Sequence, residues 1–251
     1  MSVPRLKVCG ITNLPDARAA LKAGADWLGL IAVPGTPRFM EMERSQALVE
    51  ELRVEFPHVY VVGVFQNAVP AEVAQYARTV GLNAIQLHGE ENPADFEALD
   101  LPLIKVLKLQ ANLQMAALQA QAVEALQVPQ VRAVLLDLPK GSGLKSILDW
   151  PGFHRLPELI EDIPCWVAGG LNPGNLETVL QALCPYHLAG LDVASGVERA
   201  PGQKDPTRLQ QFGDLVKTYQ STSGRNHEFR PFEVSQTNPS QINSAQTKSG
   251  D

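Results

Sequence analysis

Apolar runs and helix-like segments alternate along this chain, and this alternation restricts the possible folds more than any other feature. Eight apolar runs have the length and continuity of strands that are buried on both faces: residues 6–9, 27–32, 59–65, 84–87, 103–107, 133–136, 165–168 and 190–193. Segments with apolar residues at helical spacing follow these runs: residues 14–23, 45–56, 70–80, 93–99, 113–126, 152–160, 173–183 and 206–219. Strands separated by helices pair in parallel through right-handed crossovers. The sequence therefore predicts an α/β protein, a single (β/α)8 TIM barrel over residues 1–220.

Three Asn-Pro or Asp-Pro pairs predict where helices begin. Asn92, Asn172 and Asp205 each offer a capping side chain, and each is followed by a proline suited to the first helical position. A doubly wound open sheet, the competing fold, would normally carry a glycine-rich loop after its first strand. The segment 9–12, Cys-Gly-Ile-Thr, is not such a loop.

Composition and charge limit the classes of partner. The 251 residues are 45% hydrophobic and 19% charged, with a formal net charge of −6, so nothing favours nucleic acid or an anionic membrane. We expect a small-molecule partner, a cytoplasmic location and a monomer. No apolar run approaches the roughly 18 residues of a membrane span, and the N-terminus lacks signal-peptide features. Three cysteines without metal-ligand spacing indicate reduced thiols, and we expect no metal and no cofactor.

The C-terminal segment 221–251 differs from the rest of the chain. It is rich in Ser, Asn, Gln and Thr, with few apolar residues to offset the entropy lost on ordering. We therefore expect a disordered tail outside the barrel domain. The alternative is that residues 229–232, Phe-Arg-Pro-Phe, dock on a partner.

Chemistry in a barrel of this kind sits at the carboxyl ends of the strands, which directs attention to five side chains. Cys9 ends the first strand, although an isolated cysteine is more often an inert core residue. Arg38 follows the second strand on a proline-rich loop and could clamp a carboxylate or phosphate. Gln86 and His88, at the end of the fourth strand, point the same way. Asp137 ends the sixth strand, where a desolvated carboxyl could hold a proton near neutral pH.

The last two strands end in small residues that suit an anion. Gly169 and Gly170 follow the seventh strand, and Ser195 and Gly196 follow the eighth. In many barrels the loops after strands seven and eight bind phosphate through backbone N–H groups. These two loops therefore predict a phosphate site.

Seven motifs together resemble the phosphoribosylanthranilate isomerases of tryptophan biosynthesis. They are Lys-Val-Cys-Gly-Ile-Thr at 7–12, Pro-Arg at 37–38, Val-Gly-Val-Phe at 62–65, Gln-Leu-His-Gly-Glu at 86–90, Leu-Leu-Asp at 135–137, Gly-Gly-Leu-Asn-Pro at 169–173 and Asp-Val-Ala-Ser-Gly-Val-Glu at 192–198. The matches run in order from residue 5 to about residue 217. The tail lies outside them.

The resemblance implies a cofactor-free Amadori rearrangement of N-(5-phosphoribosyl)anthranilate to 1-(2-carboxyphenylamino)-1-deoxyribulose 5-phosphate. Asp137 would be the general acid and Cys9 the general base. Arg38 would bind the anthranilate carboxylate, and Asp192 would lie near the ribose hydroxyls. The glycines and serine of the last two loops would hold the phosphate. Glu198 and residues 201–205 would shape and cap the last helix.

Lys7 lies two residues before Cys9 on the same strand and should point to the same side. One hypothesis is that its ammonium lowers the pKa of the Cys9 thiol. The alternative is that Lys7 forms a buried ion pair lower in the barrel.

Three departures from the family pattern, the first of which is the extra C-terminal tail, leave other functions to be considered. The loop after Asp137 is short and carries Lys140 where glycine is usual, and Ala194 replaces a common serine. An indole-glycerol-phosphate synthase relative would use a catalytic lysine, for which Lys105 is the candidate, and a ribulose-phosphate epimerase relative would need metal ligands on several strands. A non-catalytic phosphosugar-binding barrel is the alternative outside the enzymes.

Overall fold

Eight parallel strands close into a barrel in the computed structural model, which describes residues 4–139, 141–186 and 188–222. Each strand pairs with its neighbours in chain order, and β8 pairs with β1 to complete the circle. The strands are β1 (Arg5–Cys9), β2 (Trp27–Ile31), β3 (Tyr60–Phe65), β4 (Ala84–Leu87), β5 (Leu103–Lys108), β6 (Val131–Asp137), β7 (Cys165–Val167) and β8 (Gly190–Val193). The predicted (β/α)8 fold is confirmed.

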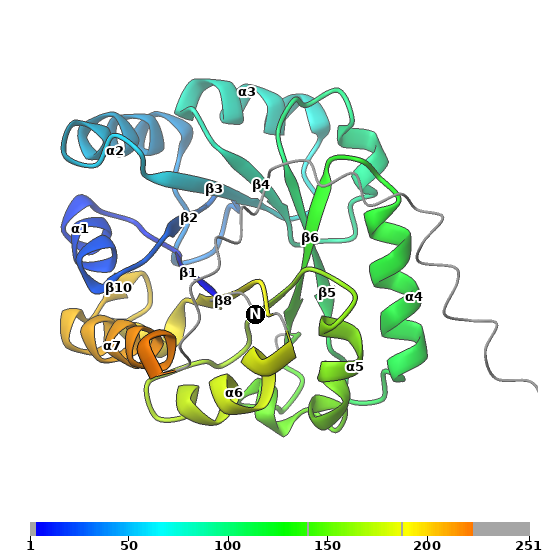
Figure 1. The fold of residues 1–251 in the computed structure, drawn as a ribbon. Helices are drawn as coiled ribbons and strands as arrows, with labels where there is room; N and C mark the ends of the chain where they lie inside the picture. The colour runs from blue at the N-terminus through cyan, green and yellow to red at the C-terminus, as the bar shows by residue number, and fades with distance from the viewer. Residues whose placement is uncertain (1–3, 140, 187, 223–251) are drawn as a thin grey trace, which may run out of the picture.

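Helices surround the barrel, as Figure 1 shows. They are α1 (Leu14–Ala23), α2 (Met42–Glu55), α3 (Pro70–Val80), α4 (Met115–Leu126), α5 (Leu156–Ile160), α6 (Leu176–Leu183) and α7 (Pro206–Thr222), and short 3₁₀ turns lie at η1 (Pro93–Phe96), η2 (Ile147–Asp149), η3 (Phe153–Arg155), η4 (Cys184–Tyr186) and η5 (Ser195–Val197). A small hairpin of β9 (Glu198–Ala200) and β10 (Gln203–Lys204) follows β8. None of the helices in the described ranges is long and apolar enough to cross a membrane.

Several of the predicted helices differ from the structure. The one predicted over 45–56 begins at Met42, and the segment 152–160 is divided into the turn η3 and the short helix α5. The segment 93–99 forms only the turn η1, because Phe96 is its one fully buried side chain and no apolar stripe supports a longer helix. The helix predicted from Pro173 begins at Leu176 instead. The side chain of Asn172 accepts a hydrogen bond from the Gly174 N–H (2.9 Å), which closes a turn ahead of the helix rather than capping it.

The other two capping predictions are confirmed. Asn92 accepts from the Ala94 N–H at the start of η1, and Asp205 accepts from the N–H groups of Thr207 and Arg208 at the start of α7. The last helix continues to Thr222, two residues past the predicted domain boundary at 220. The rest of the predicted tail lies outside the described residues.

Aromatic side chains fill the barrel toward the amino ends of its strands. The Trp27 ring stacks on Tyr60 and on Trp166, with centroids 4.6 and 4.4 Å apart. Gly190 on β8 makes room for Trp166, since a Cβ there would lie 2.5 Å from the indole ring. These rings fill the barrel interior toward the amino ends of the strands and leave its carboxyl end for the cavity described below.

Candidate functional site

A cavity of about 470 Å³ opens at the carboxyl ends of the strands. Its walls include all ten residues that the sequence analysis assigned to the site: Cys9, Arg38, Gln86, His88, Asp137, Gly169, Gly170, Asp192, Ser195 and Gly196. The cavity also includes Thr36, Gln66 and Lys108, which the sequence analysis did not select. Residues from strands and loops far apart in the chain therefore meet in one site.

The thiol of Cys9 lies at the end of β1, with 6% of the residue exposed. Gly29 faces it on β2, and a Cβ at Gly29 would lie 2.8 Å from the Cys9 sulfur, so the glycine leaves space for the thiol. Burial raises the pKa of Cys9, while the ammonium groups of Lys7 and Lys204 act to lower it. The thiol is a weak acid with two cations arranged to stabilise its thiolate.

Lys7 forms a buried ion pair, as the alternative predicted, although its partner Asp192 lines the cavity instead of lying lower in the barrel. Its Nζ donates to Asp192 Oδ2 at 2.9 Å, and both residues are buried, so the ion pair exists. Burial alone would lower the pKa of Lys7, but Asp192 and Cys9 together outweigh this effect and the pKa is raised. The same ammonium works to lower the pKa of Cys9, although burial of the thiol outweighs it.

Asp137 is the last residue of β6 and has the properties of a proton donor. Burial raises its pKa from the ordinary 3.8 to about 6, against the hydrogen bond that Oδ1 accepts from the Leu138 N–H at 2.8 Å. The other oxygen lies 3.5 Å from His88 Nε2. A carboxyl group with this pKa exchanges its proton readily near neutral pH.

Two acceptor oxygens in the cavity wall lack donors within the described part of the chain. Gln86 donates its amide toward His88 Nδ1 at 3.2 Å, but its Oε1 is buried and accepts nothing. Asp192 uses Oδ2 for Lys7, and its Oδ1 is buried without a partner. A buried unpaired acceptor costs about 1–3 kcal/mol. Hydroxyl groups of a bound ligand would supply the missing donors.

Arg38 is held by Glu198 rather than standing free. Its Nε and Nη2 donate to the two carboxylate oxygens of Glu198 at 2.8 and 2.6 Å, a bidentate pair. Of the residues expected to shape and cap the last helix, Glu198 and 201–205, it is Asp205 whose side chain provides the cap. Glu198 contacts that helix through its carbonyl oxygen, which accepts from Arg208 Nη1 at 2.6 Å. The Glu198 side chain instead lies between Arg38 and Lys204.

The glycine loops after β7 and β8 are packed too closely for larger residues. A Cβ at Gly170 would lie 2.0 Å from the Lys145 carbonyl oxygen, and one at Gly196 would lie 1.7 Å from the Leu171 carbonyl oxygen. Gly170 also has φ +67°, in the left-handed region that favours glycine. These loops bring bare backbone to the cavity wall.

Substituting Gly196→Ala is expected to distort the loop and weaken binding of inorganic phosphate by about tenfold, the equivalent of about 1.4 kcal/mol. The added methyl group has no space, so the backbone must move away from Leu171. Gly174→Ala is the matched control, since its Cβ meets only the Asn172 side chain at 3.1 Å. Calorimetric titration with inorganic phosphate measures the affinity of both variants. Equal affinity in the two variants would contradict the assignment of this loop to phosphate.

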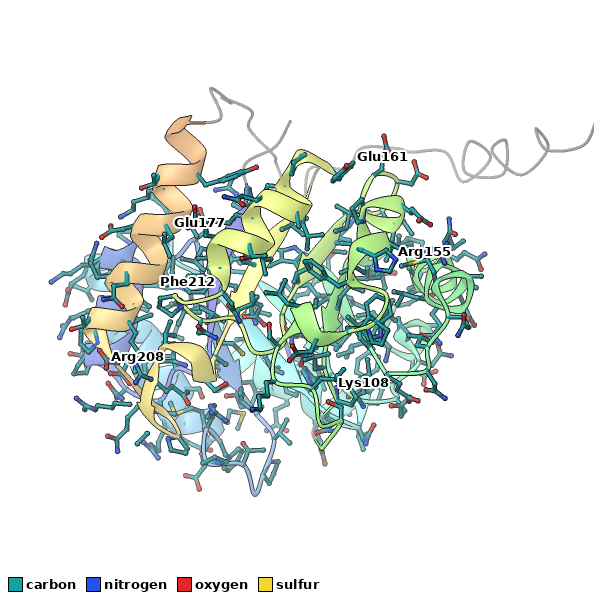
Figure 2. All side chains as sticks on the ribbon, turned by 90° about the horizontal axis from the view of Figure 1, so that it is seen from below. Lys108, Arg155, Glu161, Glu177, Arg208 and Phe212 are labelled. Atoms are coloured by element: carbon teal, nitrogen blue, oxygen red, sulfur yellow. The ribbon has the colours of Figure 1, made fainter. Side chains whose placement is uncertain are left out.

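Lys108 shows which signal the sequence analysis overlooked. Ile104 and Val106 face the barrel interior, and strand alternation places Lys108 on the same side at the carboxyl end of β5. Its Nζ pairs with Glu90 at 3.0 Å. Figure 2 shows Lys108 and Glu161 at opposite ends of the barrel. Lys105, the candidate for a synthase lysine, instead donates to the carbonyl groups of Gly89 and Glu91.

Comparison with known proteins places the chain among one group of enzymes. A family model described as N-(5'phosphoribosyl)anthranilate (PRA) isomerase matches residues 6–214. The N-(5'-phosphoribosyl)anthranilate isomerase of Myxococcus xanthus is 39% identical over 220 residues, which cover 87% of this chain and 98% of that protein. The one from Pseudomonas fluorescens Pf-5 is 35% identical over 222 residues, 86% of this chain and 97% of that protein.

Solved structures give the same result. The phosphoribosyl anthranilate isomerase of Thermus thermophilus is 34% identical with a TM-score of 0.70, covering 85% of this chain and 98% of that one. A phosphoribosyl anthranilate isomerase solved in complex with reduced 1-(o-carboxyphenylamino)-1-deoxyribulose 5-phosphate is 30% identical, with a TM-score of 0.69 and coverage of 86% and 99%.

Proposed function

We propose that this chain, which belongs to the N-(5'-phosphoribosyl)anthranilate isomerase family, converts N-(5-phosphoribosyl)anthranilate into 1-(2-carboxyphenylamino)-1-deoxyribulose 5-phosphate in tryptophan biosynthesis. The observation that carries this reaction is the meeting of Asp137, with its pKa of about 6, and the Cys9 thiol in one cavity. The reaction needs one group to give a proton and another to remove one. Binding alone needs neither.

The first step is opening of the furanose ring. The carboxyl group of Asp137 gives its proton to the ring oxygen as the bond between that oxygen and C1 breaks. The nitrogen lone pair forms the new C1–N double bond, which leaves a cationic Schiff base. A carboxyl group with a pKa near 6 is a stronger proton donor than water and is still partly protonated at neutral pH.

The second step is removal of the proton on C2 of the sugar. The positive nitrogen makes this proton acidic, and the Cys9 thiolate takes it, while the C–H electrons form a C1–C2 double bond and neutralise the nitrogen. The resulting enolamine tautomerises to the ketone. Lys7 and Lys204 favour the thiolate by their positive charge, against the cost of burial.

Two groups of residues in the cavity wall would each bind one anionic end of the substrate. The anthranilate carboxylate would bind Arg38, and the phosphate would bind the loops of Gly170, Ser195 and Gly196. The unpaired oxygens of Gln86 and Asp192 would accept the ribose hydroxyls between them. The monomeric state expected from the sequence stays a prediction.

The decisive experiment follows the loss of fluorescence of freshly prepared phosphoribosylanthranilate. Wild type should turn over, and Cys9→Ala should lose about 10²- to 10⁴-fold in kcat, the usual contribution of a general base. Cys184→Ala is the matched control, because that buried cysteine follows α6 outside the cavity. Wild-type inactivity with phosphate binding intact would overturn the proposal and favour a non-catalytic barrel.

A further inference from the structure

Lys204, which the mechanism uses only through its positive charge on the Cys9 thiolate, is buried beside the site. Lys204 is 0% exposed, and its Nζ makes three hydrogen bonds: to the Cys9 carbonyl oxygen at 2.6 Å, to the Ala194 carbonyl oxygen at 3.0 Å and to Glu198 Oε1 at 2.9 Å. An ammonium group has three donors, so all of them are used. One buried cation therefore joins the end of β1, the loop after β8 and the β9 strand.

Glu198 continues this chain of contacts to Arg38. It receives Lys204 on Oε1 and the bidentate Arg38 fork on both oxygens. The Glu198 side chain is 4% exposed, so water screens its attraction to Arg38 and Lys204 only weakly. The two hydrogen bonds use Nε and Nη2 of Arg38, which leaves Nη1 without a partner among the described residues.

The hairpin that carries these two residues is itself anchored. The Lys204 N–H donates to the buried Asp16 carboxylate at 2.8 Å, and Thr12 Oγ1 donates to the Gly202 carbonyl oxygen at 2.6 Å. Gly202 has φ +76° and lies against the Pro37 carbonyl oxygen, so the hairpin also contacts the loop that carries Arg38. The hairpin is thus fixed to both the first and second loops of the site.

We propose that Glu198 and Lys204 are positioning residues that act on substrate through Arg38, Cys9 and the loop after β8, without touching it. The trio of Arg38, Glu198 and Lys204 carries a net charge of +1, so it still attracts an anion while the guanidinium plane is fixed. Its Nη1 edge is then presented to a carboxylate. This assignment rests on the proposed function, because it takes the anthranilate carboxylate as the anion.

The test is a double-mutant cycle with the reduced 1-(o-carboxyphenylamino)-1-deoxyribulose 5-phosphate as the probe. Glu198→Gln should weaken probe binding, measured by calorimetry, by about tenfold and raise KM similarly, with kcat nearly unchanged. In an Arg38→Met background, Glu198→Gln should have no further effect, because its action passes through the missing guanidinium. Lys204→Met should lower kcat as well, since it also releases the Cys9 carbonyl.

Asp26→Asn is the matched control for loss of an ion pair. Asp26 pairs with Arg5 at 2.8 Å and accepts from the Leu6 N–H at the amino end of β1, away from the cavity. It should change thermal stability without changing probe affinity. The proposal would be overturned if Glu198→Gln weakened probe binding as much in the Arg38→Met background as in the wild-type background. It would also be overturned if Asp26→Asn weakened probe binding as much as Glu198→Gln does. A wild type that binds the probe without turnover refutes the proposed reaction, and the binding cycle still decides the positioning roles.

Discussion

Replacing Asp137 by Asn is expected to lower kcat/KM by about 10²- to 10⁴-fold while making the protein more stable at neutral pH. Asn keeps the shape of the side chain and can still accept the hydrogen bond from the Leu138 N–H. It cannot give a proton to the ring oxygen. The variant therefore removes the acid and leaves the geometry of the site intact.

The pH dependence identifies the acid more specifically than the loss of rate. Asp137 must be protonated and Cys9 ionised, and the pKa of Asp137 (about 6) lies below the raised pKa of Cys9. Below pH 6 the wild-type kcat/KM should rise with pH, because thiolate accumulates while Asp137 stays protonated. Above pH 6 it should level off, because each gain in thiolate is matched by a loss of protonated Asp137.

In Asp137→Asn the levelling near pH 6 should disappear, and the residual rate should keep rising through neutral pH. The substrate phosphate also titrates near pH 6, but it does so equally with both proteins, so the comparison isolates the carboxyl group. A variant that keeps the wild-type break near pH 6 would show that Asp137 is not the acid.

The same pKa shift predicts the sign of the stability change. Because the pKa of Asp137 rises from 3.8 to about 6 on folding, the folded protein holds this proton more tightly than the unfolded chain. Stability is lost as the pH rises between these two values, by up to about 3 kcal/mol at about 1.4 kcal/mol per unit. Asn carries no charge, so Asp137→Asn should be more stable than wild type above pH 6 and equal to it near pH 3. Urea unfolding at several pH values measures the difference.

The barrel and the residues that line its cavity were predictable from the sequence where local patterns determine them. Strand alternation predicts which residues face inward, and applied to β5 it would also have found Lys108. The end of each strand could be located because apolar runs stop where the chain leaves the barrel. Helix length was less predictable: an Asn-Pro pair signals a start, but at Pro93 too few apolar residues follow to extend the turn.

The charge network of the site was beyond local reasoning. Arg38 and Glu198 are 160 residues apart, and Lys204 reaches Cys9 across 195 residues. No pattern within either segment indicates the other partner. The sequence therefore predicted the residues that line the cavity better than those that hold them in place.

Breaking the buried pair of Lys7 and Asp192 is expected to have the largest effect on stability. Lys7→Met keeps the length of the side chain but removes the charge, which leaves the Asp192 carboxylate buried and unpaired. Removing one partner of a buried ion pair costs about 3–5 kcal/mol. Loss of the ammonium should also raise the pKa of the Cys9 thiol further, because Lys7 is the strongest of the groups that lower it.

Denaturant unfolding measures the loss of stability, and the pH midpoint of Cys9 alkylation measures the change in the pKa of the thiol. Cys165 and Cys184 are fully buried and should not react in the folded protein. The double variant Lys7→Met/Asp192→Asn separates the loss of stability from the shift in the Cys9 pKa. It removes the unpaired charge as well, so it should recover much of the stability, because the penalty arises from the stranded carboxylate and not from the lost attraction. It should restore the alkylation midpoint only in part: loss of the Asp192 charge lowers the pKa of Cys9, but the larger effect of the missing Lys7 cation remains. A single variant as stable as wild type would mean that the barrel interior solvates Asp192 without Lys7.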